Sequence, residues 1–469
     1  MKTIKNIILL LVLGSNSLLA QTQMSLDDAM KYALNNNLSI KNSKLNIDDA
    51  EARIKENGAT ALPQISGELG VSAFYLKPQV VLPASFSDGT PRAVFGILNA
   101  YGVKDGQGNL IPGTPPANPN AGAPLKVSFV QTFNITPVVT ASELLFSGSY
   151  NVAKKAATMA RDLAAKQLAG KEMEIKNAVV DAYLPTLIMN EGLKTFDKNI
   201  SSLEKLLFET KAINKEGFVE NLDVERLTLS LENVKAEREN LLRQKEIVLS
   251  ALKFAMGMPL TSALDVSDDL SKLTQSVDEM TLMGDVNFKK RADYNVIESA
   301  QNLQNLTIEL NKASALPTVA AFMNFQYGFQ GNSFKKNEGF WIPQGLIGLN
   351  AKFPLYDFGI RKYGMQRAVI ASETVKNQKS DFERVVNLQV EIARIAYKNA
   401  QKRIETQQKN LKLAEKIYNT TKIKYKEGIG SSIEIIQAET ALFQTQQTLT
   451  QAQYDLLKAK MDIKKALGL

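Results

Sequence analysis

The sequence predicts an α+β membrane protein made of two copies of one strand-strand-helix-helix unit. Short motifs recur at a constant distance along the 469 residues. Segments beside these motifs alternate between apolar and polar residues, and long stretches with almost no glycine or proline follow them. A repeat that keeps its register over such a distance indicates that one structural unit has been duplicated.

Residues 1–20 are expected to be a secretory signal peptide. Lys2 and Lys5 precede an apolar run from Ile7 to Leu13, and small and polar residues then lead to Ala20. This layout is typical of export signals. The run is shorter than the roughly 20 apolar residues of a membrane-spanning helix. A buried N-terminal helix is the alternative, and it is disfavoured by the same short length.

The composition excludes several kinds of chemistry. The chain has no cysteine and no histidine, and its net charge is +8. A disulfide, a His/Cys metal site and a histidine base are therefore impossible. We find no glycine-rich phosphate loop and no Ser/Lys motif, and the charge follows no pattern that indicates nucleic acid. We expect no cofactor, no metal and no enzymatic activity, with a hydrolase that uses paired carboxylates as a minor alternative.

Shorter helices are predicted in residues 21–60 and 257–312. The segments 25–57 and about 286–312 are amphipathic, and each leads into an Ala-Leu-Pro sequence. Ser25 followed by Asp28 resembles a capping box. Residues 257–285 are predicted to be an irregular, acidic connector between the two copies, without the spacing of a calcium loop.

Two β-hairpins are predicted, over residues 61–142 and 313–356. Apolar and polar residues alternate at 65–75, 319–329 and 347–355, and less cleanly at 127–141. Strands with one apolar and one polar face are typical of barrels that face lipid. Trp341 lies beside Phe340 where a strand is expected to begin, as aromatic residues do at membrane interfaces. Four strands of a soluble sandwich are the alternative.

The first hairpin has 43 more residues than the second between its Ala-Leu-Pro and the following glycine, Gly148. The excess lies in PASFSDGT and GQGNLIPGTPPANPNAGAP, which are rich in proline, glycine and asparagine. We predict that both stretches are exposed loop. The loop from about 77 to 125 is expected to be extracellular.

Long helical hairpins are predicted over residues 143–256 and 357–469. Gly148 in ELLFSGSYNVAKKAA and Gly359 in LYDFGIRKYGMQRA are 211 residues apart, and about 65 helical residues follow each. At ~1.5 Å per residue, such a helix is roughly 100 Å long. Returning helices are expected over about 221–256 and 431–467, too polar for a globular core but suited to a thin wall that is wet on both sides. Pro185 is predicted to kink the first long helix.

The turns between the long helices contain the most informative repeat. INKEGFVENLDVERL and KYKEGIGSSIEIIQA place Gly217 and Gly428 at equivalent positions, and the acids Asp223 and Glu434 follow six residues later. Glycine suits a backbone where one helix stops and another begins. An acid in the first turn of a helix contributes ~0.3 to 1 kcal/mol through the helix dipole. The acids are therefore either helix caps only, or also a ring of charge in a symmetric opening.

Four strands cannot close a membrane barrel, and open sheet edges cannot face lipid. Several chains must therefore pool their strands into an even total of at least eight. A barrel continued by such helices would form a conduit from the outer membrane far into the periplasm.

The chain resembles the TolC-like outer-membrane efflux proteins. The resemblance rests on the duplicated unit, on Ala-Leu-Pro before a strand, on LLFSG and LYDFG before a long helix, and on YKEGIGSSIEIIQAETAL at the second turn. It implies a homotrimer with a 12-stranded β-barrel in the lipid of a Gram-negative outer membrane, four strands coming from each chain. The barrel would be continued by a helical periplasmic tunnel with an equatorial region of short helices.

The resemblance also implies an exit duct for small molecules such as drugs and toxic compounds, or for secreted polypeptides. An inner-membrane pump and a periplasmic adaptor protein would deliver them. The main alternative is a secreted periplasmic coiled-coil protein with a structural or adaptor role. That alternative accounts for the helices but not for the amphipathic strands.

At the turns, the resemblance implies roles for individual residues. Asp223 and Tyr425 match members of a network that closes the periplasmic tip, and Glu434 matches an acid of an entrance ring. Gln437 stands where a second ring acid can occur, and Gly430 stands where an arginine can pair with the first acid. We therefore expect a closing contact that is built differently or is looser.

Overall fold

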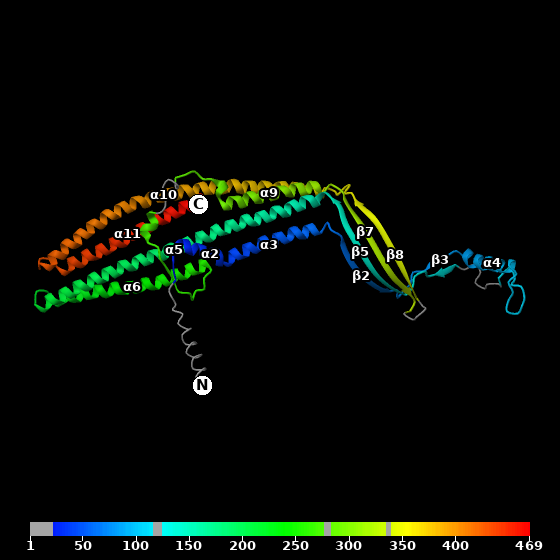
Figure 1. The fold of residues 1–469 in the computed structure, drawn as a ribbon, viewed down its shortest axis with the longest axis horizontal. Coiled ribbons are helices and arrows are strands. Elements are labelled where there is room, and N and C mark those ends of the chain that lie inside the picture. Colours follow the sequence, from blue (N-terminus) through cyan, green and yellow to red (C-terminus); the bar gives the residue numbers. More distant parts are fainter. Residues whose placement is uncertain (1–21, 116–123, 276–282, 334–338) are drawn as a thin grey trace, which may run out of the picture. The chain divides into compact units, whose positions relative to one another are not determined.

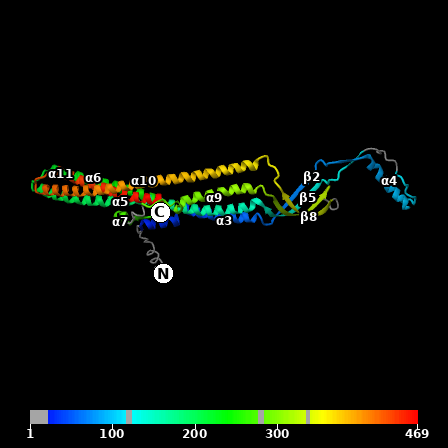
Figure 2. The same ribbon diagram turned by 90° about the horizontal axis from the view of Figure 1, so that it is seen from above.

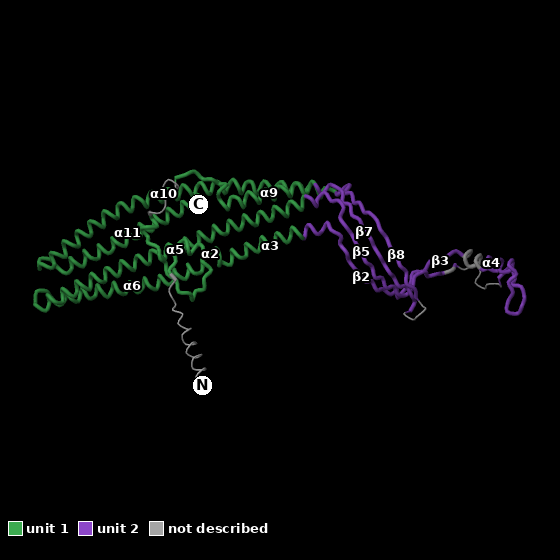
Figure 3. Tube along the Cα trace, in the orientation of Figure 1, with its two compact units in different colours: residues 1–55, 152–312, 358–469 green, residues 56–151, 313–357 purple. Residues whose placement is uncertain are grey.

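The computed structural model describes residues 22–115, 124–275, 283–333 and 339–469, so the predicted signal peptide lies outside the described residues. Helices make up 67% of the described residues and strands 16%, which confirms the predicted mixed class. The chain divides into two compact units (Figure 3). One contains most of the long helices, and the other contains the main β-sheet.

The main sheet has four antiparallel strands in the order β2-β5-β7-β8 (Figure 1). They are β2 (Gln64–Ala73), β5 (Phe133–Ser147), β7 (Thr318–Gly331) and β8 (Gly339–Lys352). The two copies of the repeat meet where β5 pairs with β7. Strands β2 and β8 are consequently the two edges of the sheet, and each has one side without a partner strand among the described residues.

Two strands have different limits from those expected. Strand β5 continues to Ser147, into the segment expected to begin the helical hairpin, because its pairing with β7 continues past an irregularity between Leu144 and Phe146. A Cβ on Gly148 would lie only 2.4 Å from the Leu316 side chain, so the helix begins where no side chain fits. Strand β8 begins at Gly339 and pairs with β7 along its whole length.

The register of the sheet separates an apolar face from a polar face. Residues directly opposite each other on paired strands lie on the same face. Two rows on one face are Ile65, Ala141, Met323 and Ile347, and Val71, Ile135, Phe329 and Trp341. Two rows on the other face are Ser66, Thr140, Asn324 and Leu346, and Glu68, Val138, Gln326 and Gln344. The alternation predicted from the sequence therefore continues across all four strands.

Aromatic side chains gather at the end of the sheet where β8 begins. Trp341 stacks on Tyr327, with ring centroids 5.1 Å apart, and its ring also lies 5.4 Å from that of Phe329. The prediction that Trp341 stands at a strand start is correct, since it is the third residue of β8.

The insertion in the first hairpin is not entirely loop. Strands β3 (Val80–Leu82) and β4 (Leu125–Val127) pair antiparallel, and helix α4 covers Ala84–Ala100. The expectation that PASFSDGT is loop is therefore wrong for residues 84–90. The apolar run at residues 93–98 favours a helix. This helix begins earlier, within the turn-forming residues 84–90. Turns do occur at 101–108, while residues 116–123 lie outside the described part of the chain.

Four long helices form the helical unit (Figures 1 and 2). They are α5 (Gly148–Lys215), α6 (Asn221–Met256), α10 (Ile360–Lys426) and α11 (Ser432–Leu467), close to the predicted limits. Helix α5 continues through Pro185. No helix among the described residues has an apolar run long enough to cross a membrane.

The N-terminal segment predicted as one helix is divided into α2 (Leu26–Asn36) and α3 (Leu38–Ala59). Asn37 separates them, and its side chain accepts a hydrogen bond from the Ser39 amide at 2.8 Å and donates one to the Ala255 carbonyl at 3.0 Å. These bonds hold the break in place against α6. The predicted cap is present, because the Ser25 hydroxyl accepts a bond from the Asp28 amide. The later short helix is α9 (Ala292–Ala313), preceded by a 3-10 turn, η1 (Phe288–Lys290).

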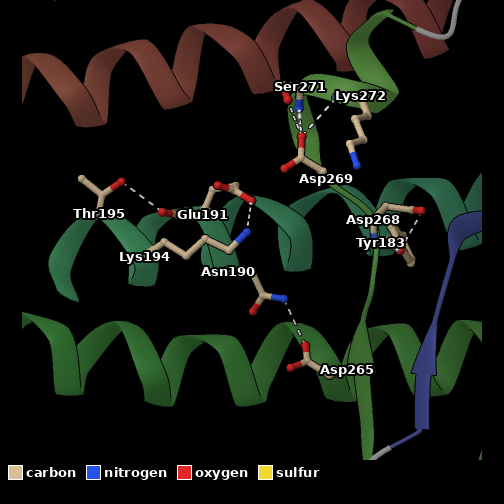
Figure 4. A network of polar contacts seen from close by, with 10 residues as sticks. All are labelled: Tyr183, Asn190, Glu191, Lys194, Thr195, Asp265, Asp268, Asp269, Ser271 and Lys272. Atoms are coloured by element: carbon tan, nitrogen blue, oxygen red, sulfur yellow. Dashed lines mark hydrogen bonds and ion pairs between the residues drawn. The ribbon is translucent and has the colours of Figure 1, made fainter. Parts of the chain in front are cut away.

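The connector is more regular than expected. It contains β6 (Leu264–Val266), which pairs in parallel with β1 (Thr22–Met24), and helix α7 (Leu270–Gln275). Three aspartates organise it (Figure 4). Asp265 accepts hydrogen bonds from Asn190 on α5 and from Lys245 on α6, while Asp268 accepts one from the Tyr183 hydroxyl at 2.9 Å. Asp269 accepts bonds from the backbone at the start of α7.

Buried apolar side chains form a core at the level of the connector and another near the turns. The first joins α2, α5, α6 and β6 around Tyr183. The second, called here the tip core, joins all four long helices. It consists of Leu203, Leu206, Leu207, Leu227, Leu231, Tyr418, Tyr425, Ile435 and Ala438.

Candidate functional site at the helical turns

Both helical turns use the same backbone arrangement. Gly217 and Gly428 have φ angles of 80° and 75°, in the left-handed region that favours glycine. The Phe218 amide donates to the Ile213 carbonyl, and the Ile429 amide donates to the Lys424 carbonyl. These 6→1 hydrogen bonds are those of a Schellman motif, which ends α5 at the first turn and α10 at the second. The predicted role of the two glycines at hairpin turns is therefore seen directly in their backbone geometry.

Asp223 lies between the two hairpins. Its carboxylate accepts a short hydrogen bond from the hydroxyl of Ser432, at the start of α11. Arg226, one turn along α6, places its guanidinium 3.6 Å from the same carboxylate. Ser432 is 2% exposed, so water has little access to its side of this contact. The sequence repeat identified Asp223, but nothing in it indicated Ser432 as the partner.

The structure shows how the contact forms without an arginine at position 430. A Cβ on Gly430 would lie 3.1 Å from the Tyr425 amide nitrogen and 3.3 Å from the Lys424 side chain, so the turn is tight there. Ser432 and Arg226 instead supply the groups that face Asp223. Asp223 is therefore held by a hydroxyl and by a guanidinium from its own helix, and its role in closing the turns stays a prediction.

Tyr425 lies in the tip core and joins α10 to α5. Its hydroxyl is 3.2 Å from the Thr210 hydroxyl, and both side chains are buried. Burial raises the pKa of Tyr425, the bond to Thr210 opposes that shift, and the charge of Asp223 adds to it. Asp223 and Tyr425, which the sequence placed 202 residues apart, are thus close enough to influence each other.

Glu434 and Gln437 occupy a different environment. The Glu434 amide donates a hydrogen bond to the Ser431 hydroxyl at 3.3 Å, and its side chain is exposed in the first turn of α11. Gln437 is also exposed, and it lines a groove between α6 and α11 together with Arg226 and Ile433. A single chain therefore brings the charge of Asp223 near Tyr425, whereas the Glu434 side chain lies exposed at the start of α11.

Further polar contacts between the hairpins were not predicted. Lys426 pairs with Glu209 at 2.9 Å, and the hydroxyls of Ser202 and Tyr418 are 2.9 Å apart. Each joins α5 to α10. The sequence offered one indication of these contacts. All four residues lie within about 20 positions of a turn glycine, and the equal spacing of the two copies places such residues at similar heights on α5 and α10.

The arrangement holds the two hairpins together and leaves the Glu434 side chain exposed at the surface. Within the described residues no group of three or more acidic side chains is placed to hold a metal ion. Four hydroxyl and charge contacts cross between the hairpins, which also share one apolar core, so the arrangement holds the two turns together.

Comparison with known proteins agrees with this picture. Residues 291–469 match the model of a family described as outer membrane efflux protein. The outer membrane protein VceC of Vibrio cholerae has the same fold, with a TM-score of 0.65 and 15% identity over 94% of this chain and 96% of VceC. The CmeC outer membrane channel of Campylobacter jejuni matches with a TM-score of 0.65 and 14% identity, over 94% and 85% of the two chains. No curated protein matches significantly.

Proposed function

We propose that this chain is the exit channel of an export system. The family match and the fold confirm the predicted resemblance to the TolC-like outer-membrane efflux proteins. The comparisons support an outer-membrane efflux channel rather than an enzyme. The finer features are our proposal. Three chains assemble, their sheets close a 12-stranded barrel in lipid, and their helices form a periplasmic tunnel.

The two-faced sheet is the observation that carries this proposal. Its apolar rows are open to the surroundings in the single chain, and Ile347 is 79% exposed. Its polar rows include Asn324, Gln326 and Gln344, which suit a water-filled interior. Edge strands that face lipid must be paired. Pairing β8 of one chain with β2 of the next would satisfy both edges and close a ring.

The helices also present surface that a single chain does not cover. Ile247, Leu388 and Ile392 are more than half exposed although they lie well inside long helices. Apolar side chains in such numbers are typical of a surface buried by another subunit. Neighbouring copies of the same helical unit would cover them.

The turns are proposed to form the periplasmic entrance, closed in the resting state. Asp223 and Tyr425 hold the hairpins together, and Glu434 lies where threefold repetition would produce a ring of charge. Phe218 and Ile429 follow the turn glycines directly and are 82% and 77% exposed. They would provide apolar contacts for a periplasmic adaptor protein, which links the channel to an inner-membrane pump. Small molecules and polypeptides both remain candidates for the exported substrate.

A pair of adjacent substitutions tests the proposal. Ile347→Lys places a charge on the apolar face, and Leu346→Lys places the same charge on the polar face of the same strand. A lysine at the bilayer midplane costs about 2 to 4 kcal/mol on the lipid side of a barrel, whereas residues inside tune selectivity. We expect Ile347→Lys to reduce trimers in outer-membrane fractions strongly, and Leu346→Lys to assemble and change ion selectivity.

The unmodified protein should purify as a detergent-requiring trimer that conducts in planar bilayers. A monomer that stays in solution without detergent would instead support the periplasmic coiled-coil alternative. Equal tolerance of lysine at both positions would show that the two faces do not meet different solvents, and the barrel would have to be abandoned.

A further inference from the structure

A buried carboxyl group on α11 is not used by any contact described above. Glu439 is 5% exposed and lies one turn beyond Ile435 and directly after Ala438, both of the tip core. One of its carboxylate oxygens, Oε2, has no hydrogen-bond partner among the described residues. An unpaired ionised carboxylate in such a position is costly, and the group responds by binding a proton.

The surroundings of Glu439 are only partly polar. It borders a cavity of about 100 Å³ whose other lining residues are Lys198, Asn199, Ser202, Leu442, Phe443 and Gln446. The Oδ1 atom of Asn199 is likewise buried, and no described residue forms a hydrogen bond with it. Phe443 packs edge to face on Phe196, with ring centroids 4.8 Å apart, which makes one wall aromatic.

Each neighbouring helix brings a different group toward this carboxyl. Helix α5 brings Lys198 and the Ser202 hydroxyl, and α10 brings Tyr418 and Lys422. Lys422 lies 5.5 Å from the centre of the Tyr418 ring. Helix α6 contributes Leu227 and Leu231 to the adjoining tip core. Burial raises the pKa of Glu439 to about 7, while the Ser202 hydrogen bond and the charge of Lys422 oppose the shift.

We propose that Glu439 is a proton-binding site that sets how tightly the two helical hairpins hold together near their turns. When protonated, the carboxyl is neutral and tolerates its place between α5 and α10. When ionised, it favours separation of these helices, because separation admits water. The inference deepens the proposed closed entrance and rests on that function for its effect on transport, but not for its effect on the hairpins.

The direction of the pH dependence follows from the raised pKa. The packed state holds its proton up to about pH 7, whereas a carboxyl in water releases it near 4.5. The packed contact is therefore most stable at low pH, weakens as pH rises from about 4.5 to about 7, and changes no further above that. The difference corresponds to a shift in the opening equilibrium of up to about 300-fold per protomer.

Hydrogen exchange of the purified full-length protein tests this without any transport assay. Exchange is compared between wild type and Glu439→Gln in peptides around Ser202 and Tyr418, at the same pH from 5 to 8.5, so that the intrinsic pH dependence of exchange cancels. We expect the ratio of wild-type to variant rates to rise from pH 5 by one to two orders of magnitude and to level off above about pH 7. Glu415→Gln, which removes an exposed carboxylate on α10, should give a flat ratio.

A second variant identifies the titrating group. Ser202→Ala removes the hydrogen bond that favours the ionised form of Glu439. The midpoint of the rise in exchange rate should therefore lie at a higher pH in Ser202→Ala than in wild type. This comparison is made against wild type and remains informative if Glu439→Gln does not assemble. A ratio that is independent of pH for Glu439→Gln, or an unmoved midpoint for Ser202→Ala, would overturn the proposal. If the ratio titrates as expected but the protein does not conduct in bilayers, the proposed function fails and this inference stands.

Discussion

The contact between Asp223 and Ser432 should be an energetic coupling that opposes opening of the entrance. Asp223→Ala removes the carboxylate, Ser432→Ala removes the hydroxyl, and the double variant removes both. Each single change breaks the same bond. We therefore expect both to raise the resting conductance, and the double variant to raise it little beyond the larger single effect.

The structure bounds the size of this effect. A hydrogen bond to a charged group contributes about 1.5 to 3 kcal/mol. The Asp223 side chain is 21% exposed, which places the contact near the lower end of that range because water screens it. The Arg226 pair is longer and more exposed, and adds about 0 to 1 kcal/mol. A coupling of about 1.5 kcal/mol changes the opening equilibrium roughly tenfold per contact. In the proposed trimer, with one such contact from each chain, the change is about a thousandfold if all three open together.

Single-channel recording in planar bilayers measures the open fraction of the four proteins needed for the cycle. Glu237→Ala, an exposed acid on the same helix as Asp223, controls for the loss of charge alone. A coupling energy below ~0.5 kcal/mol, which is the usual limit of additivity, would mean that the two residues act independently. Unchanged conductance in every variant would leave Asp223 as a helix cap.

Three further outcomes are expected. If Glu434 faces the axis of a trimer, Glu434→Gln should weaken cation selectivity and block by multivalent cations in the same recordings, and an unchanged selectivity would place this acid away from the pore. An epitope inserted near Pro115 should bind antibody on intact cells, and masking until the outer membrane is broken would reverse the proposed orientation. Gly428→Ala should lower stability to thermal unfolding by about 1 to 2 kcal/mol, because the φ of 75° is unfavourable for alanine although no atom lies in the way. Gly58→Ala, in a helix with equal space, should not be destabilising.

Much of the architecture was predictable because it follows from periodicity. Alternation identified all four strands of the main sheet, and the lack of glycine and proline identified all four long helices. Non-local pairing was harder to anticipate. The parallel bridge between β1 and β6 joins segments of three residues each, too short for any period to be visible. The division at Asn37 depends on a bond to Ala255, more than 200 residues away.

The candidate site shows the same limit at the level of side chains. The repeat pointed to Asp223, Tyr425 and the two turn glycines because their spacing is preserved between copies. Ser432 is one of two adjacent serines, and only the geometry of the α11 start shows which one caps the helix and which one faces Asp223. Glu439 is one of many acids in the sequence. Its burial depends on three helices at once, and no local pattern records that.

The unpaired edges of the sheet have a consequence for biogenesis. A chain that entered the bilayer alone would expose the outer amides and carbonyls of β2 and β8 to hydrocarbon, where each unsatisfied group costs several kcal/mol. In the proposed trimer, subunits would therefore have to meet before or during insertion. Production of the inserted form should rise more steeply than the first power of expression level, and newly exported chains would depend on periplasmic chaperones to shield those edges until three have met.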